Sequence, residues 1–241
     1  MGIPVMILGE SGSGKTYSIK NMDPDQVGVF LCEKSRLPFR GPRFKTFQVR
    51  NRKLENGEIL RQGGVIQALL KKPKLRCYVV DDSQYIMSNE FFDRATEKGY
   101  DKFTEIGKNF RDLIHFVNNN LPDDVIVYFL HHPESDSTTG RIKAKTIGKM
   151  LDSVLTLEGC FDIILKAETN GMEHWFTYQS NGLDTVKSPE DMFSSEDGRL
   201  PNDLAAVDTA IRRYYDMDPI ASSAPPGPAE AGAGAADSEA W

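Results

Sequence analysis

The segment that most constrains the fold is residues 9–16, Gly-Glu-Ser-Gly-Ser-Gly-Lys-Thr, which directly follows the apolar run at residues 3–8. It matches the pattern G-x-x-x-x-G-K-[ST], and residues 17–21 can begin a helix, so the expected order is strand, loop, helix. Glycines in such a loop let backbone N–H groups point inward at phosphate oxygens. A chance match is expected in about one chain of this length in a hundred. The pattern therefore predicts a phosphate-binding loop rather than an ordinary glycine-rich turn.

The residue types in this loop indicate ATP and Mg²⁺ as cofactors. Lys15 supplies a cation for the β- and γ-phosphates, and the Thr16 hydroxyl is suited to ligate Mg²⁺. The residues predicted to contact the nucleotide are Gly9, Glu10, Ser11, Gly12, Ser13, Gly14, Lys15, Thr16 and Tyr17.

A second motif supports this prediction. The apolar run at residues 77–80 is followed by Asp81 and Asp82, the form of a Walker B strand whose carboxylate holds Mg²⁺ through water. Asp81 is the predicted metal residue, together with Thr16, because it comes directly after the run. A capping aspartate at the end of an ordinary buried strand is the alternative.

Hydrolysis also needs a group that activates water near the γ-phosphate. Glu33 ends the apolar run at residues 27–32, and Asp82 follows the predicted metal carboxylate. Both are candidates, since Glu33 fits the arrangement of RecA-like ATPases and Asp82 fits the acidic pair of AAA+ enzymes.

Apolar runs alternate with helix-like segments along the chain. The runs at residues 3–8, 27–32, 77–80 and 125–130 are continuous, as in a sheet buried on both faces. Residues 58–70 and 103–117 have helical spacing, residues 161–165 and 174–179 are strand-like, and a last helix is predicted at 203–214. The fold class is therefore α/β with a mostly parallel sheet flanked by helices.

Composition divides the chain of 241 residues into one domain and a tail. Residues 1–216 are predicted to form the domain, whereas 217–241 are rich in Pro, Ala and Gly and predicted to be disordered. The tail is either a solubilising segment or a docking peptide. No apolar run approaches the roughly 20 residues of a membrane helix, no secretory signal is predicted, and three scattered cysteines suit a reducing cytoplasm.

The net charge of −6 hides a strong asymmetry. Residues 34–76 contain thirteen Lys or Arg and two Glu, a net charge of +11. This basic segment is either a surface for a polyanion or a set of solvated side chains. Phe39, Phe44 and Phe47 alternate with its basic residues, which fits stacking of bases or, with slightly more support, an edge strand whose aromatic residues pack inward.

Taken together, the motifs resemble those of the phage-encoded RecA-like ATP-binding proteins, a group linked to single-strand annealing and homologous recombination. The resemblance extends over nearly all of residues 1–216, and its matching pieces are residues 9–16, Glu33, Asp81, His131 and His132 after residues 125–130, residues 145–151, residues 187–189 and residues 201–204. It implies a RecA-like core, Mg²⁺-dependent ATP hydrolysis, action on single-stranded DNA, a homo-oligomer, a possible single-strand-binding protein as partner, no membrane association and location in the host cytoplasm.

The resemblance also implies roles for individual residues. Glu33 would polarise the attacking water, and His131 would be the sensor where relatives carry Gln or Asn, with His132 as an equal candidate. Residues 133–149 match the loop that contacts single-stranded DNA. Its candidate phosphate contacts are Arg141, Lys143, Lys145 and Lys149, and Lys187 would reach the γ-phosphate of a neighbouring subunit.

Two other functions remain open from the sequence. A P-loop kinase for a nucleotide or small molecule would use the same loop, although residues 131–170 contain only Arg141 where a kinase lid carries several arginines. A regulatory nucleotide-binding module with negligible turnover is the third possibility.

Overall fold

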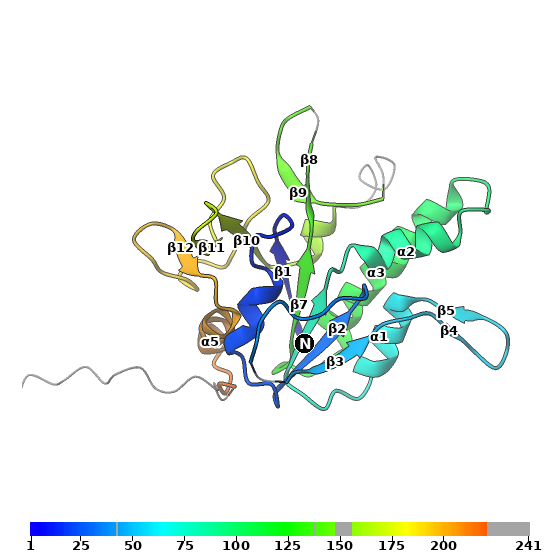
Figure 1. Cartoon of the computed structure of the whole chain (residues 1–241), viewed down its shortest axis with the longest axis horizontal. Helices are drawn as coiled ribbons and strands as arrows, with labels where there is room; N and C mark the ends of the chain where they lie inside the picture. Colours follow the sequence, from blue (N-terminus) through cyan, green and yellow to red (C-terminus); the bar gives the residue numbers. More distant parts are fainter. Residues whose placement is uncertain (42, 137, 148–155, 221–241) are drawn as a thin grey trace, which may run out of the picture.

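The computed structural model describes residues 1–41, 43–136, 138–147 and 156–220. Within them, eight strands form one sheet flanked by helices, so the predicted α/β class with a mostly parallel sheet is confirmed (Figure 1). The strand order across the sheet is β12 (Arg199–Pro201), β11 (His174–Thr177), β10 (Ile163–Thr169), β1 (Ile3–Leu8), β7 (Ile126–His131), β6 (Cys77–Asp81), β2 (Val27–Leu31) and β3 (Lys45–Gln48).

The strand β1 lies inside the sheet, with β7 on one side and β10 on the other, both parallel to it. The pairs β7–β6, β6–β2 and β2–β3 are parallel as well. In contrast, β11 and β12 extend the sheet in antiparallel fashion. The carboxyl ends of six neighbouring strands therefore meet at one edge, where α/β proteins bind their ligands.

Alternate residues of each central strand pack into two apolar layers. Met6 and Leu8 of β1 face the layer covered by α1 (Gln62–Leu70), α2 (Tyr85–Asp93) and α3 (Asp101–Asn120). Val5 and Ile7 face the layer covered by the short 3₁₀ helix η1 (Thr16–Asn21) and by α5 (Leu204–Tyr214). Burial on both faces explains why the sequence of β1 is apolar without alternation.

Several predicted boundaries were wrong. The helix predicted at 58–70 begins only at Gln62, because β4 (Arg52–Lys53) and β5 (Ile59–Leu60) form a hairpin whose turn uses Gly57 at φ +88°. The strand predicted at 161–165 begins at Ile163 instead. The disordered tail predicted at 217–241 lies outside the described residues from position 221 onward.

The aromatic residues of the basic segment pack inward. Phe44 is 7% exposed in one apolar layer, and Phe39 packs against it edge to face. Phe47, on the edge strand β3, packs edge to face against Phe30 on the other layer. Of the two interpretations of these aromatics, inward packing is confirmed, but only Phe47 lies on the edge strand β3.

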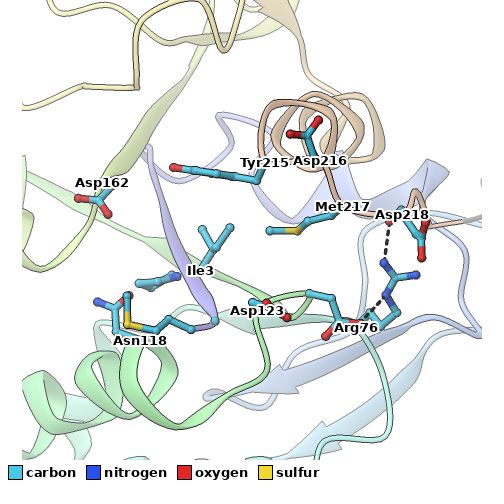
Figure 2. A pocket seen from close by; sticks show the side chains of 13 residues that line it. Ile3, Arg76, Asn118, Asp123, Asp162, Tyr215, Asp216, Met217 and Asp218 are labelled. Atoms are coloured by element: carbon cyan, nitrogen blue, oxygen red, sulfur yellow. Dashed lines mark hydrogen bonds and ion pairs between the residues drawn. The ribbon is translucent and has the colours of Figure 1, made fainter.

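The basic segment does not form a single face. Arg36 lies at the carboxyl ends of the strands, whereas Arg76 immediately precedes β6 and lies at the opposite, amino end. There Arg76 pairs with Asp124 at 3.0 Å and lines a cavity of about 520 Å³ together with Asp123, Asp162 and Asp218 (Figure 2). The two ends of the segment are thus separated by the height of the sheet.

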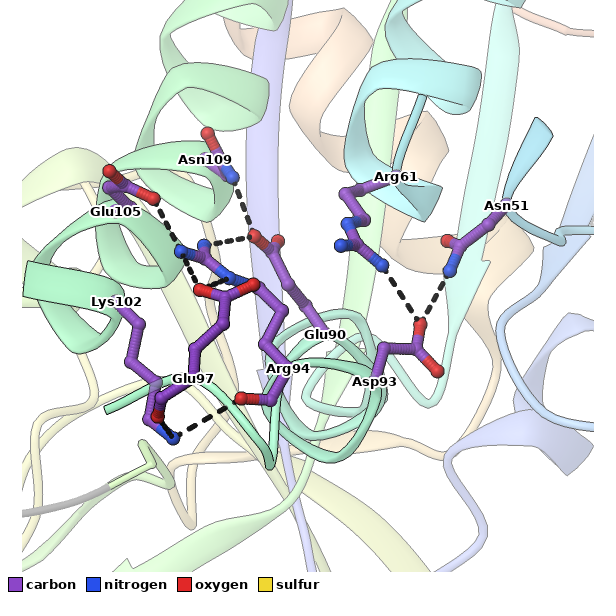
Figure 3. Close-up of polar contacts among 9 residues, drawn as sticks. All are labelled: Asn51, Arg61, Glu90, Asp93, Arg94, Glu97, Lys102, Glu105 and Asn109. Atoms are coloured by element: carbon purple, nitrogen blue, oxygen red, sulfur yellow. Dashed lines mark hydrogen bonds and ion pairs between the residues drawn. The ribbon is translucent and has the colours of Figure 1, made fainter. Parts of the chain in front are cut away.

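A polar network fixes α2 against its neighbours (Figure 3). Arg94 bonds to Glu90, Glu97 and Glu105, and the pKa of its guanidinium is raised by the bond to Glu97. Asp93 accepts bonds from Asn51 and Arg61, which join α2 to the chain on either side of the β4–β5 hairpin. The network holds the helix that follows Asp82.

None of the helices in the described ranges combines the length and apolar character needed to cross a membrane.

Candidate phosphate-binding site

A cavity of about 770 Å³ lies at the carboxyl ends of the strands, around the loop that follows β1. Seven of the nine predicted nucleotide contacts line it: Glu10, Ser11, Gly12, Gly14, Lys15, Thr16 and Tyr17. Gly9 and Ser13 are not among its lining residues, because they pack against each other and, for Gly9, against Ala167. The other lining residues are Ser35, Arg36, Pro38, Asp81, Asp82, Tyr85, His132 and His174.

The loop turns through two glycines in the left-handed region. Gly12 has φ +81° and Gly14 has φ +94°, conformations that L side chains rarely adopt. The side chain of Lys15 folds back so that its ammonium donates to the carbonyl oxygens of Gly9 and Glu10. Lys15 is only 6% exposed, and burial lowers the pKa of its ammonium.

Thr16 and Asp81 are in direct contact. The Thr16 hydroxyl donates to Asp81 Oδ1 at 2.8 Å, although the two residues are 65 positions apart. Asp81 ends the buried strand β6 and is 3% exposed. Burial raises the pKa of its carboxyl to about 6, because desolvation outweighs the bond from Thr16. The structure thus brings together the two residues predicted to hold the metal.

Asp82 lies in the same cavity but in a different electrostatic environment. Its carboxylate is 3.4 Å from His132 Nε2, and hydrogen bonding by that imidazole lowers the pKa of Asp82. Asp82 has φ +56°, a left-handed conformation that aspartate tolerates better than most side chains. Neighbouring aspartates therefore have pKa values shifted in opposite directions.

Glu33 follows β2 and is half-buried, but it is not among the cavity-lining residues. Its carboxylate accepts a hydrogen bond from Asn89 Nδ2 on α2 at 2.8 Å. Asn89 also bonds to Gln62 at the start of α1, so Glu33 is held by a chain of amides. Of the two candidate carboxylates for water activation, Asp82 is the one that lines the cavity.

His131 does not reach the cavity. It is fully buried, its Nδ1 lies 2.8 Å from Ser83 Oγ, and its Nε2 lies 2.9 Å from the carbonyl oxygen of Lys145. Since a carbonyl only accepts, Nε2 carries the proton, and burial lowers the pKa of His131 to about 4. His132, the other sensor candidate, is the histidine of β7's end that lines the cavity.

The predicted DNA-contacting loop forms a hairpin of β8 (Pro133–Ser135) and β9 (Ile142–Ala144), which projects beyond the carboxyl end of β7 (Figure 1). Arg141 donates to the carbonyl oxygen of Asp184, and Lys143 pairs with Glu134 at 3.4 Å. Lys145 is exposed. Lys149 lies outside the described residues.

Lys187 lies away from this cavity in its own chain. Its backbone pairs with Ile164 of β10, and its side chain is exposed beside a separate cavity of about 440 Å³.

Five lining residues were missed by reasoning from the sequence: Ser35, Arg36, Pro38, Tyr85 and His174. Arg36 and Tyr85 come from segments after β2 and β6, and His174 comes from the antiparallel strand β11. Arg36 and Tyr85 follow apolar runs of a sheet predicted to be mostly parallel, and parallel strands end at the same edge, so their positions held a usable signal. For His174 the sequence offered no such signal, because nothing in the residues around it indicates that β11 joins the sheet beside the loop.

No known protein-family model matches this chain, and a search of curated proteins found no match either. Assignment of the cavity therefore rests on its residues and their geometry.

Proposed function

We propose that this chain is a RecA-like P-loop ATPase that binds ATP with Mg²⁺. The observation that carries the proposal is the hydrogen bond between Thr16 and Asp81 at 2.8 Å, which joins the end of the phosphate loop to the end of β6. A hydroxyl and a carboxylate in contact at the edge of a nucleotide-sized cavity are the protein ligands that Mg²⁺ needs, because Mg²⁺ takes its other ligands from phosphates and water.

The residues around the cavity fit both cofactors. Gly12 and Gly14 have the conformations of a loop that turns N–H groups inward, and Lys15 is held against it. No group of three or more His, Cys, Asp or Glu side chains able to hold a metal was found among the described residues. A site that uses one or two carboxylates plus phosphate oxygens does not need such a group. Bound Mg²⁺ would neutralise charge on the β- and γ-phosphates.

For hydrolysis we propose Asp82 as the residue that orients water, with Glu33 as the alternative. Asp82 lines the cavity and its lowered pKa keeps it ionised, as a hydrogen-bond acceptor for water must be. We expect Asp82→Asn to reduce single-turnover hydrolysis by at least about 100-fold while ATP still binds. Glu33→Gln is the matched control; a comparable loss in that variant alone would transfer the role to Glu33.

We propose single-stranded DNA as the polymer on which this ATPase acts. The support is the β8–β9 hairpin, whose far strand leads to the exposed Lys145 and whose base is bonded to His131 and His132. Binding to oligonucleotides should strengthen with ATP and weaken steeply with salt, because phosphate contacts release counterions. Absence of salt-sensitive binding with any nucleotide would refute this part of the proposal.

A kinase is the second candidate, because side chains outside the phosphate loop also line the cavity. Arg36 and Tyr85 are among these lining residues, and they could contact an acceptor molecule. Separation of the products of labelled ATP by thin-layer chromatography distinguishes the two functions. Free phosphate, increased by single-stranded DNA, supports the ATPase, whereas a phosphorylated acceptor supports the kinase.

A further inference from the structure

Two side chains from the C-terminal part of the chain hold the backbone of the phosphate loop. His174 Nδ1, on β11, lies 3.0 Å from the carbonyl oxygen of Ser13. Asn202 Nδ2, in the turn between β12 and α5, donates to the carbonyl oxygen of Gly14 at 3.2 Å. Consecutive carbonyls of the loop are thus each held by a residue more than 160 positions later in the chain.

Both side chains pack closely over Gly14. A Cβ atom added there would lie 2.4 Å from Asn202 Nδ2 and 3.0 Å from His174 Nδ1. The glycine is therefore required twice, by its φ of +94° and by the two side chains that occupy the place of a Cβ.

The direction of these carbonyls determines the direction of the amides that would bind phosphate. In a trans peptide the C=O and the following N–H point in opposite directions, and the described residues contain no cis peptide. Holding the carbonyls of Ser13 and Gly14 toward the C-terminal strands turns the N–H groups of Gly14 and Lys15 the opposite way. Gly14 O can accept from both Asn202 and Ser18, because a carbonyl oxygen has two lone pairs.

We propose that His174 and Asn202 are positioning residues of the phosphate loop, which orient two of its amides for the bound nucleotide. This inference rests on the proposed nucleotide binding. For His174 it requires the tautomer with the proton on Nδ1, since the partner is a carbonyl that only accepts. The two side chains fix the shape of the loop before any reaction takes place. We therefore expect them to affect the affinities for ATP and ADP equally and to have little effect on the rate of hydrolysis.

The test uses variants that keep or remove a donor at each position. Asn202→Leu keeps a similar shape without a donor or a charge, and His174→Phe keeps a ring without a donor. His174→Asn retains an N–H close to the place of Nδ1, whereas His174→Gln retains one close to the place of Nε2. Met172→Ala, in the same β10–β11 turn at 93% exposure, is the control.

The measurements are dissociation constants for Mg·ATP and Mg·ADP, with the single-turnover hydrolysis rate at saturation. We expect Asn202→Leu and His174→Phe to weaken both nucleotides by about three- to tenfold, the worth of one hydrogen bond, with the rate at saturation within about twofold. His174→Asn and Met172→Ala should bind as the wild type does. Thermal midpoints without nucleotide verify that each variant is folded, and Asn202→Ala replaces Asn202→Leu if the latter is not.

Other outcomes overturn the inference. Unchanged affinities in Asn202→Leu and His174→Phe would remove the positioning role. Retention by His174→Gln with loss in His174→Asn would instead indicate a direct contact of Nε2 with the nucleotide. Failure of the wild-type protein to bind either nucleotide would refute the proposed function itself, and the inference with it.

Discussion

Replacing Asp81 by Asn should stabilise the protein without ligand while removing its response to Mg·ATP. Burial raises the pKa of Asp81 from 3.8 to about 6, so ionisation of this carboxyl costs the folded state free energy. A difference of about two pH units corresponds to about 3 kcal/mol. Asn keeps an oxygen that can accept the Thr16 hydroxyl but carries no charge.

The sign of the pH dependence follows from the raised pKa. Below pH 3.8 Asp81 is protonated in both the folded and the unfolded state, and its favourable contribution to the free energy of unfolding is fully present. As the pH rises through about 6, the unfolded state gains from ionisation and that contribution is lost. The free energy of unfolding of Asp81→Asn should therefore exceed that of the wild type by up to about 3 kcal/mol at pH 8, which corresponds to about 10 °C in Tm. Below pH 4 the two free energies should be almost equal.

The assay is chemical and thermal unfolding at several pH values, with and without Mg·ATP. At 100 times its Kd, a ligand should stabilise the wild type by about 2.7 kcal/mol, and Asp81→Asn should lack most of this gain. Asp82→Asn is the matched control, because the pKa of Asp82 is lowered by His132 and removal of its charge should destabilise the protein at neutral pH. A variant Asp81→Asn that is no more stable than the wild type at pH 8, or equally more stable at pH 4, would refute the reasoning.

Three further predictions concern other parts of the structure. Burial lowers the pKa of His131 from 6.5 to about 4, so the stability gained from its neutral form is present above pH 6.5 and is lost as the pH falls toward 4. When the free energy of unfolding is measured against pH, a His131→Gln variant should lose less stability than the wild type between these two values. Gly14→Ala should destabilise the fold by at least about 1 kcal/mol and weaken nucleotide binding, whereas Gly12→Ala, with open space around its Cβ, should show only the cost of its φ; urea unfolding compares the two, and equal losses would contradict the packing argument. Arg212 is 1% exposed and its Nε donates to Asp208 at 2.6 Å, so Arg212→Met should cost about 3–5 kcal/mol by leaving a buried charge unpaired. Adding Asp208→Leu should restore part of this loss in a double-mutant cycle, because the charge is removed but the buried Tyr128 hydroxyl loses its acceptor.

The centre of the fold could be predicted from the sequence because its signals are local. A continuous apolar run such as residues 3–8 has few alternatives to a buried strand, and its bounds match β1. Asp203 caps α5 by accepting from Ala205 N, a signal present in the residue types near the predicted start. In contrast, Ile59 and Leu60 have helical spacing with the apolar residues of α1, and the turn at Gly57 overrides it.

The site was predictable where a motif fixes the residues and not where the fold brings distant segments together. The contact of Thr16 with Asp81 follows from two motifs at the ends of parallel strands. The motifs did not predict which of the two adjacent histidines lines the cavity. Side chains alternate along β7, so that His131 is buried and His132 faces the cavity. His174 depends on antiparallel pairing of β11, which neither its residue type nor its spacing predicts.

The bonds from His174 and Asn202 to the phosphate loop also have a consequence for biosynthesis. The loop leaves the ribosome well before the segment that holds it, because Asn202 follows Gly14 by 188 residues. At about 5–20 residues per second, the last group that holds the loop is made roughly 10–40 s after the loop itself. During this interval the nascent chain carries the loop without the groups that hold its shape, so we expect the proposed nucleotide to bind tightly only after Asn202 has been made.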